Sequence, residues 1–161
     1  MSSRSSRRSA GLLLHRGRGE ELKVLLVHPG GPMWASREAG AWSVPKGEYL
    51  DGEDPLAAAR REFEEELGSA PPEGDARELG EIRQKSGKRV RAWALPGDLD
   101  TTEVHSNTFM FQWPPRSGKM IEIPEVDRAE WFRLDTAREK INPGQVPLLD
   151  RLVEIVGSTG G

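Results

Sequence analysis

The chain has 161 residues, the size of one domain with a single hydrophobic core. Its net charge of −3 argues against broad binding to nucleic acid, and no apolar run approaches the length that spans a bilayer. Because cysteine is absent, disulfides, a thiol nucleophile and a Cys-ligated zinc site are excluded. We expect a cytoplasmic protein that binds no membrane and forms no stable complex with nucleic acid.

The N-terminal part is Ser/Arg-rich over residues 1–8, which predicts a disordered tail rather than a signal peptide, because the apolar stretch after it is short and lacks a cleavage site. Residues 9–15 and 22–28 predict two strands joined by a turn. A long loop rich in Gly and Pro follows, and such loops are typically functional or disordered. It carries Trp34 and Trp42, and either ring could stack on a nucleobase. We take Trp42, which lies directly before the next motif, as the candidate substrate-binding residue.

A helix is predicted over residues 56–67, where the sequence is rich in good helix formers. Asp54 suits the N-cap, Pro55 the first turn and Gly68 a left-handed C-terminal stop. The apolar residues of this helix fall on one stripe, which should be buried: Leu56, Phe63 and Leu67.

Another face of the same helix carries Glu62, Glu65 and Glu66, which are related by i, i+3 and i+4. Carboxylates crowded together repel one another unless a cation lies among them, and hard oxygen ligands suit Mg²⁺ or Mn²⁺. Arg61 is placed to pair with Glu65 one turn later. The alternative is a solvated charged face, which is common on helices of this composition.

The spacing of the whole stretch favours the metal site. It fits the pattern G-x5-E-x7-R-E-U-x-E-E-x-G-U, the Nudix box, in which U is a bulky apolar residue. Ser69 departs from the pattern at a position that packs rather than reacts. The chain therefore resembles the Nudix hydrolases through eight residues in register: Gly47, Glu53, Arg61, Glu62, Phe63, Glu65, Glu66 and Gly68.

The rest of the chain predicts a hairpin, two further strands and two helices, with no internal repeat. The ranges are 79–84 and 89–95 for the hairpin, 108–113 and 129–134 for the strands, 136–141 and 146–156 for the helices, with 157–161 fraying. This order predicts an α/β fold with a mixed sheet flanked by helices. The resemblance implies the same fold, the Nudix-type α/β/α sandwich, as a single domain over residues 9–156.

The resemblance also implies a reaction, the hydrolysis of a phosphoanhydride in a nucleoside diphosphate linked to another group. It implies Mg²⁺ or Mn²⁺ as the cofactor and a small-molecule nucleotide as the substrate. Carried over by position, Glu62, Glu65 and Glu66 are the metal ligands, and the Lys46 carbonyl is a further candidate. Arg61 matches a residue that braces the loop against the helix together with Glu53. Glu65 or Glu66 could instead polarise the attacking water, and the sequence leaves both roles open.

Many Nudix enzymes take a further carboxylate from a loop before a late strand that contains Trp. Glu125 precedes Trp131 by six residues, which resembles the spacing in diadenosine tetraphosphate hydrolases. We therefore prefer Glu125 to Glu122 as a metal ligand or catalytic group. An exposed Glu in a charged loop is the alternative.

Two features favour dinucleoside polyphosphates, such as diadenosine tetraphosphate, as the substrate. The Trp-x-x-Pro-Lys-Gly segment before the box resembles that of diadenosine polyphosphate and diphosphoinositol polyphosphate hydrolases, and residues 85–93 resemble the basic strand that grips the polyphosphate there. Lys46, Lys85, Lys88 and Arg89 are therefore candidate phosphate contacts, although a basic hairpin tip is often only solvated. The alternatives are a nucleoside triphosphate pyrophosphohydrolase, a nucleotide-sugar hydrolase, a non-catalytic nucleotide sensor and a protein-interaction domain.

Overall fold

The computed structural model describes residues 8–159. The expected tail falls on residues 1–8, of which 1–7 lie outside the described residues and Arg8 already begins the first strand. The strands are β1 (Arg8–Arg16), β2 (Lys23–Pro29), β3 (Lys46–Glu48), β4 (Arg77–Arg83), β5 (Arg89–Pro96), β6 (Thr108–Gln112), β7 (Met120–Pro124) and β8 (Val126–Arg133). The helices are α1 (Pro55–Leu67), α2 (Leu134–Lys140) and α3 (Val146–Thr159), with 3-10 turns at Gly19–Glu21, Thr101–Glu103 and Pro143–Gln145.

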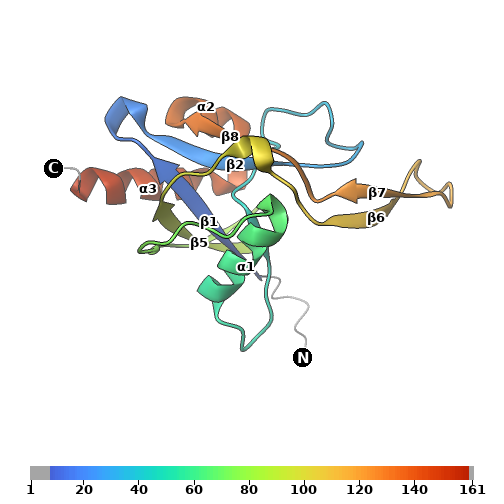
Figure 1. The fold of residues 1–161 in the computed structure, drawn as a ribbon, viewed down its shortest axis with the longest axis horizontal. Helices are drawn as coiled ribbons and strands as arrows, with labels where there is room; N and C mark the ends of the chain where they lie inside the picture. The colour runs from blue at the N-terminus through green and yellow to red at the C-terminus, as the bar shows by residue number, and fades with distance from the viewer. Residues whose placement is uncertain (1–7, 160–161) are drawn as a thin grey trace.

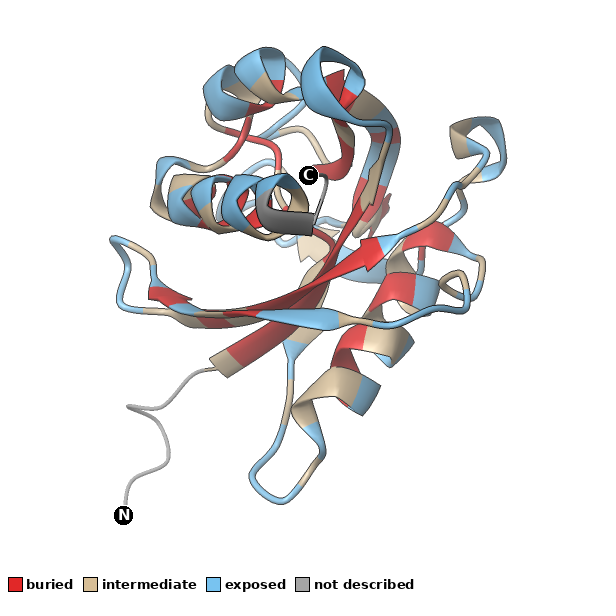
Figure 2. Cartoon of the chain, turned by 90° about the vertical axis from the view of Figure 1, so that its left-hand side faces the viewer, coloured by how far each residue is buried: buried red, intermediate tan, exposed pale blue. Residues whose placement is uncertain are grey.

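A mixed sheet forms the centre of the molecule, with the strand order β4-β5-β1-β2-β8. β1 runs parallel to β5 and antiparallel to β2, and β3 pairs with the beginning of β1. α1 covers one face of the sheet, whereas α2 and α3 cover the other (Figures 1 and 2). The predicted fold class, a mixed sheet flanked by helices, is confirmed. No helix in residues 8–159 has the length and apolar character needed to cross a bilayer.

Both faces of β1 are buried, because successive side chains of a strand point to opposite faces. Leu12 and Leu14 belong to the apolar cluster beneath α1, which includes Phe63. Leu13 belongs to the cluster beneath α3, which includes Leu148. Burying each such side chain contributes about 1.5–3 kcal/mol. The packing of Phe63 fixes the rotation of α1, so that its carboxylates turn away from the core.

The ends of α1 agree with the sequence prediction. The Asp54 carboxylate accepts a hydrogen bond of 2.9 Å from the Ala57 N–H. Gly68 has a φ of 78°, the left-handed conformation in which a side chain would be strained, and its N–H donates to the Glu64 carbonyl at 2.8 Å. A Cβ at Gly68 would also lie 2.5 Å from the His105 carbonyl oxygen. The caps therefore fix the residues at which the helix begins and ends.

Two strands were not predicted, β3 and β7. β7 pairs with β6 as a separate two-stranded sheet, the β6–β7 arm, which extends from the body of the molecule (Figure 1). The signal for β7 was the alternation of Ile121 and Ile123, which is short and lies directly after a loop rich in Pro and Gly. In addition, β8 begins at Val126 rather than at residue 129, and α3 continues to Thr159 rather than ending at residue 156.

Candidate active site

A cavity of about 190 Å³ lies where β3, the C-terminal half of α1 and the start of β8 meet. Lys46, Glu66 and Glu125 line it, so the structure brings together three candidates that are up to 79 positions apart in the chain. Trp34 also lines this cavity, from the loop between β2 and β3, and Gln84 lines it from the end of β4. This catalytic cavity is therefore bordered by the predicted helix, loop and hairpin.

Arg61 braces the loop before α1 as expected. Its guanidinium donates to Glu53 at 3.0 Å, to Glu62 at 2.8 Å and to Glu65 at 3.2 Å. Glu53 in turn accepts a hydrogen bond from the Leu50 N–H at 3.2 Å, and that bond, followed by the one from Arg61, lowers the pKa of Glu53. One cation thus ties the loop to the helix and neutralises part of the acidic face.

Glu66 is the most perturbed carboxyl group of the site. Burial is the main cause that raises the pKa of Glu66 to about 8; the positive charge of Lys46 opposes the shift, and repulsion from Glu125 and Glu62 adds to it. The backbone N–H of Lys46 also donates a hydrogen bond to this carboxylate. Burial lowers the pKa of the Lys46 ammonium, and repulsion from Lys88 adds to that effect. The cavity thus contains an acid and a base that are both partly removed from water.

Glu125 is held at the cavity by its backbone. Its N–H donates to the Asn107 carbonyl at 2.9 Å, and its carbonyl accepts from the Gly30 N–H at 3.3 Å. The Asn107 N–H donates to the Glu65 carbonyl at 2.9 Å, so Asn107 joins the last turn of α1 to the strand that follows Glu125. Burial raises the pKa of Glu125, and repulsion from Glu65 adds to the shift. Glu122, the other candidate, lies on β7, where its carboxylate accepts from the Thr108 hydroxyl at 2.7 Å.

The three helix carboxylates do not form a closed ligand cluster. Within residues 8–159, no group of three His, Asp or Glu side chains has the spacing to hold a metal ion. The physical reason is that like charges separate: Glu62 and Glu65 turn to Arg61, whereas Glu66 faces Lys46.

The donor set nevertheless fits a hard divalent cation. Glu62 is half-buried, and burial raises its pKa, with repulsion from Glu65 adding to the shift. The ligand atoms available are carboxylate oxygens, which Mg²⁺ and Mn²⁺ prefer. A divalent ion would relieve the repulsion that adds to the effect of burial in raising the pKa values of Glu62, Glu66 and Glu125.

Comparison with known proteins identifies the family. The NUDIX domain model matches residues 5–152, which is most of the chain. The chain belongs to the Nudix family. The predicted family and the predicted enzyme class, a Nudix pyrophosphohydrolase, are thereby confirmed, and Nudix enzymes generally require a divalent metal ion.

Three relatives illustrate the similarity. An RNA pyrophosphohydrolase of Rhodospirillum rubrum is 29% identical over 160 residues, which cover 92% of this chain and 91% of that protein. An octanoyltransferase of Myxococcus xanthus is 33% identical over 134 residues, 83% of this chain, but this chain spans only 33% of that protein. The structure of a C. elegans Ap4A hydrolase complex superimposes with a TM-score of 0.64 at 22% identity, covering 94% of this chain and 98% of that chain.

The basic hairpin lies beside the Nudix box. Lys88 forms an ion pair of 3.6 Å with Glu48 on β3, and its charge acts on Lys46. Arg89 begins β5 and is paired in register with Arg8 on β1, and Lys85 is in the exposed turn of the hairpin. Lys88 thus lies near the Nudix loop, and the hairpin reaches the catalytic cavity through Gln84.

Trp42 is not available to stack on a base, so this candidate is wrong. Its ring is fully buried and packs edge-on against Phe132 at 4.9 Å and against His28 at 5.1 Å. Its indole N–H donates to Glu38 at 3.2 Å, and the Arg128 guanidinium lies 5.1 Å from the ring centre. Trp42 is therefore a core residue that anchors the end of the long loop.

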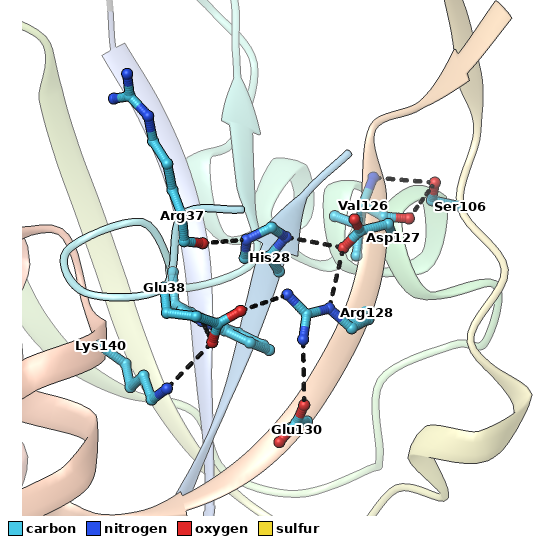
Figure 3. Close-up of polar contacts among 10 residues, drawn as sticks. His28, Arg37, Glu38, Ser106, Val126, Asp127, Arg128, Glu130 and Lys140 are labelled. Carbon is cyan, nitrogen blue, oxygen red and sulfur yellow. Dashed lines mark hydrogen bonds and ion pairs between the residues drawn. The ribbon is translucent and has the colours of Figure 1, made fainter. Parts of the chain in front are cut away.

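The long loop is held in place by a polar network, shown in Figure 3. Nε2 of the buried His28 lies 2.7 Å from the Arg37 carbonyl oxygen, and Nδ1 lies 2.9 Å from Asp127 (Figure 3). The Glu38 carboxylate accepts from Arg128 at 2.7 Å and from Lys140 at 3.1 Å. These contacts connect the loop to β8 and α2 and give His28 a structural role.

Sequence reasoning missed the polar residues that support the cavity from elements that are distant in sequence. Gln145 is buried, accepts from the Val44 N–H at 3.0 Å and donates to Gln84 at 2.9 Å. The Ser106 hydroxyl lies within 3.1 Å of both the N–H and the carbonyl of Val126 (Figure 3). These residues have no local pattern, because each acts through a contact between segments that only the folded chain brings together.

Proposed function

We propose that this Nudix enzyme hydrolyses a phosphoanhydride bond of dinucleoside polyphosphates with Mg²⁺ or Mn²⁺ as cofactor. The observation that carries the proposal is the catalytic cavity, where Glu66, Glu125 and Lys46 meet and where the charge of Lys88 on the basic hairpin acts on Lys46. A long polyphosphate bridge carries several negative charges and needs cationic contacts along its length. A nucleotide sugar, which has a shorter bridge, would reach fewer of them.

In this proposal, the carboxylates of Glu62, Glu65, Glu66 and Glu125, with the Lys46 carbonyl, hold the divalent ion. The bound ion neutralises the phosphates and lowers the pKa of water. Rigid elements position the side chains that would bind the ion. The caps of α1 fix the glutamates of the helix, and hydrogen bonds to the Asn107 backbone fix Glu125.

Arg61 has a positioning role, because it contacts Glu53 and two of the metal-ligand candidates rather than the cavity. The proton of the attacking water passes to a carboxylate of the site, for which Glu65, Glu66 and Glu125 are the candidates. Phosphoryl transfer depends mainly on positioning and on charge stabilisation, so the ammonium groups of Lys46 and Lys88 would act on the polyphosphate electrostatically.

A second function is favoured by the Rhodospirillum rubrum relative, which is named an RNA pyrophosphohydrolase. This chain would then hydrolyse a phosphoanhydride bond in the triphosphate at the 5′ end of an RNA. Nucleoside triphosphates and nucleotide sugars are the remaining substrate classes. A non-catalytic sensor is disfavoured because every glutamate of the Nudix box is present.

The test is a comparison of kcat/KM for dinucleoside tetraphosphates, nucleoside triphosphates, a triphosphorylated oligoribonucleotide and nucleotide sugars, with Mg²⁺ and with Mn²⁺. The triple change Lys85→Ala, Lys88→Ala and Arg89→Ala should lower kcat/KM for the tetraphosphates at least tenfold more than for nucleotide sugars. Nucleotide sugars proving the best substrates, or an equal loss on every substrate, would contradict the proposal.

A matched control removes the same charge at the other end of the sheet. Arg18, Arg77 and Arg133 lie near the end of β1, the start of β4 and the end of β8, away from the Nudix loop. Changing these three residues to Ala should leave the substrate ratio unchanged. A ratio that falls equally in both triple variants would indicate an effect of net charge rather than of the hairpin.

A further inference from the structure

A second, apolar groove lies next to the catalytic cavity. It has a volume of about 60 Å³ and is formed by residues 30–34 of the long loop together with Phe109, Phe111 and Ile123 of the β6–β7 arm. We name it the aromatic groove. Trp34 lines both this groove and the catalytic cavity, so the two are adjacent at this residue.

The groove is built from the backbone upward. A Cβ at Gly30 would lie 2.2 Å from the Pro124 carbonyl oxygen, and one at Gly31 would lie 2.6 Å from the Ile123 side chain. Gly31 also has a φ of 98°, which a side chain would strain. Glycine at both positions therefore lets the loop pack directly on β7, and this contact closes one wall of the groove.

The aromatic rings of the groove are accessible and fixed. Trp34 is 37% exposed and Phe109 is 44% exposed. The Arg37 guanidinium lies 5.5 Å from the Trp34 ring centre, which restrains that ring. Phe109 and Phe111 lie 6.3 Å apart on one face of the arm, whereas Met110 and Met120 belong to the other face because side chains alternate along a strand.

The residues that form the groove include no charged side chain, so its walls recognise a flat apolar face rather than a phosphate. Aromatic rings can stack on any nucleobase, because every base has a π-face. We propose that the aromatic groove is a nucleobase subsite, which receives the second nucleoside of a dinucleoside polyphosphate whose phosphates lie in the catalytic cavity. This inference rests on the proposed function, and it adds the residues that distinguish a dinucleotide from a mononucleotide.

The kinetic test compares diadenosine tetraphosphate with adenosine 5′-tetraphosphate, which carries as many phosphates but lacks the second nucleoside. In Phe109→Ala, the ratio of kcat/KM for the dinucleotide to that for the mononucleotide should fall about tenfold, the range expected for one lost stacking contact. Phe109→Tyr should restore the ratio. Met110→Ala, a change at the next residue on the opposite face, is the matched control and should leave the ratio unchanged.

A binding test separates failure of the subsite from failure of the proposed function. Adenosine is titrated into the metal-free protein, and the indole N–H resonance of Trp34 is followed by NMR, with Trp34→Phe for assignment. The resonance should shift in the wild type and in Met110→Ala, and not in Phe109→Ala. A resonance that does not move up to the solubility limit of adenosine overturns the subsite, whether or not the enzyme cleaves dinucleoside polyphosphates.

Two kinetic outcomes would also overturn the assignment. One is an equal change of the substrate ratio in Phe109→Ala and Met110→Ala. The other is an effect of Phe109→Ala only on a 5′-triphosphorylated oligoribonucleotide, which would assign the arm to a nucleic-acid strand instead. If the wild type cleaves neither tetraphosphate, the proposed function fails, and the adenosine titration alone decides whether the groove binds a base.

Discussion

Gly47→Ala should damage the site while leaving the fold intact. A Cβ at Gly47 would lie 1.9 Å from Oε1 of Glu62, 2.0 Å from Cδ and 2.6 Å from Cγ. Non-bonded carbon contacts lie at about 3.5 Å, so the Glu62 side chain must move by roughly 1.5 Å. That movement also disturbs its hydrogen bond of 2.8 Å with Arg61.

A shift of about 1 Å in a catalytic group costs on the order of 100-fold in rate, so we expect kcat to fall by about that factor. The melting temperature should change little, because the added methyl restricts the unfolded chain and partly offsets the lost contact. Hydrolysis is assayed over a range of Mg²⁺ concentrations, and the concentration for half-maximal activity should rise.

The control for an added methyl group is Gly157→Ala, because a Cβ at Gly157 of α3 would meet nothing within 4 Å. Its activity should equal that of the wild type. If Gly47→Ala keeps the wild-type kcat and the wild-type metal dependence, activity does not require the Glu62 side chain to pack against Gly47.

Three further predictions concern individual side chains. Since the folded-state pKa of Glu66 is about 8 against an ordinary 4.5, its stabilisation of the metal-free protein is fully present below pH 4.5 and is lost as pH rises through 8. Glu66→Gln should therefore reduce the fall in melting temperature between pH 4.5 and pH 8, and it should abolish turnover. A melting temperature that falls with pH as steeply as in the wild type would show that Glu66 does not cause the fall. Glu125→Gln should lower kcat at least tenfold with Mg²⁺, whereas Glu122→Gln should have little effect, and equal small effects would refute the choice. Ser106→Ala leaves the Val126 N–H without its hydroxyl partner, which should cost about 1–3 kcal/mol by urea unfolding, and a loss below the error of that measurement would refute the bond.

The parts of the structure that follow from local sequence were predicted well. The N-cap at Asp54, the stop at Gly68 and the burial of Phe63 all depend on residues within one helix, and periodicity and capping rules describe such contacts. The pairing of Arg61 with Glu65 follows from the same helical spacing.

The choice between Trp34 and Trp42 did not follow from local sequence. Both belong to one loop, and the difference arises from Phe132 and Arg128 of β8, which enclose Trp42 and leave Trp34 exposed. The arrangement of the helix carboxylates likewise depends on charge. Helical spacing places Glu62, Glu65 and Glu66 near one another, but their repulsion directs them to different cations.

The position of Glu125 shows how a distant contact can still leave a sequence signal. Trp131 is fixed in β8, because it is opposite Leu25 in the register with β2 and its indole N–H donates to the Leu99 carbonyl at 3.1 Å. A strand advances by about 3.3 Å per residue, so counting back from a fixed Trp131 sets where β8 begins. Glu125 is the residue immediately before that strand. A fixed number of residues between two positions in the sequence therefore predicts where one lies relative to the other in the fold, provided that a strand of fixed register connects them.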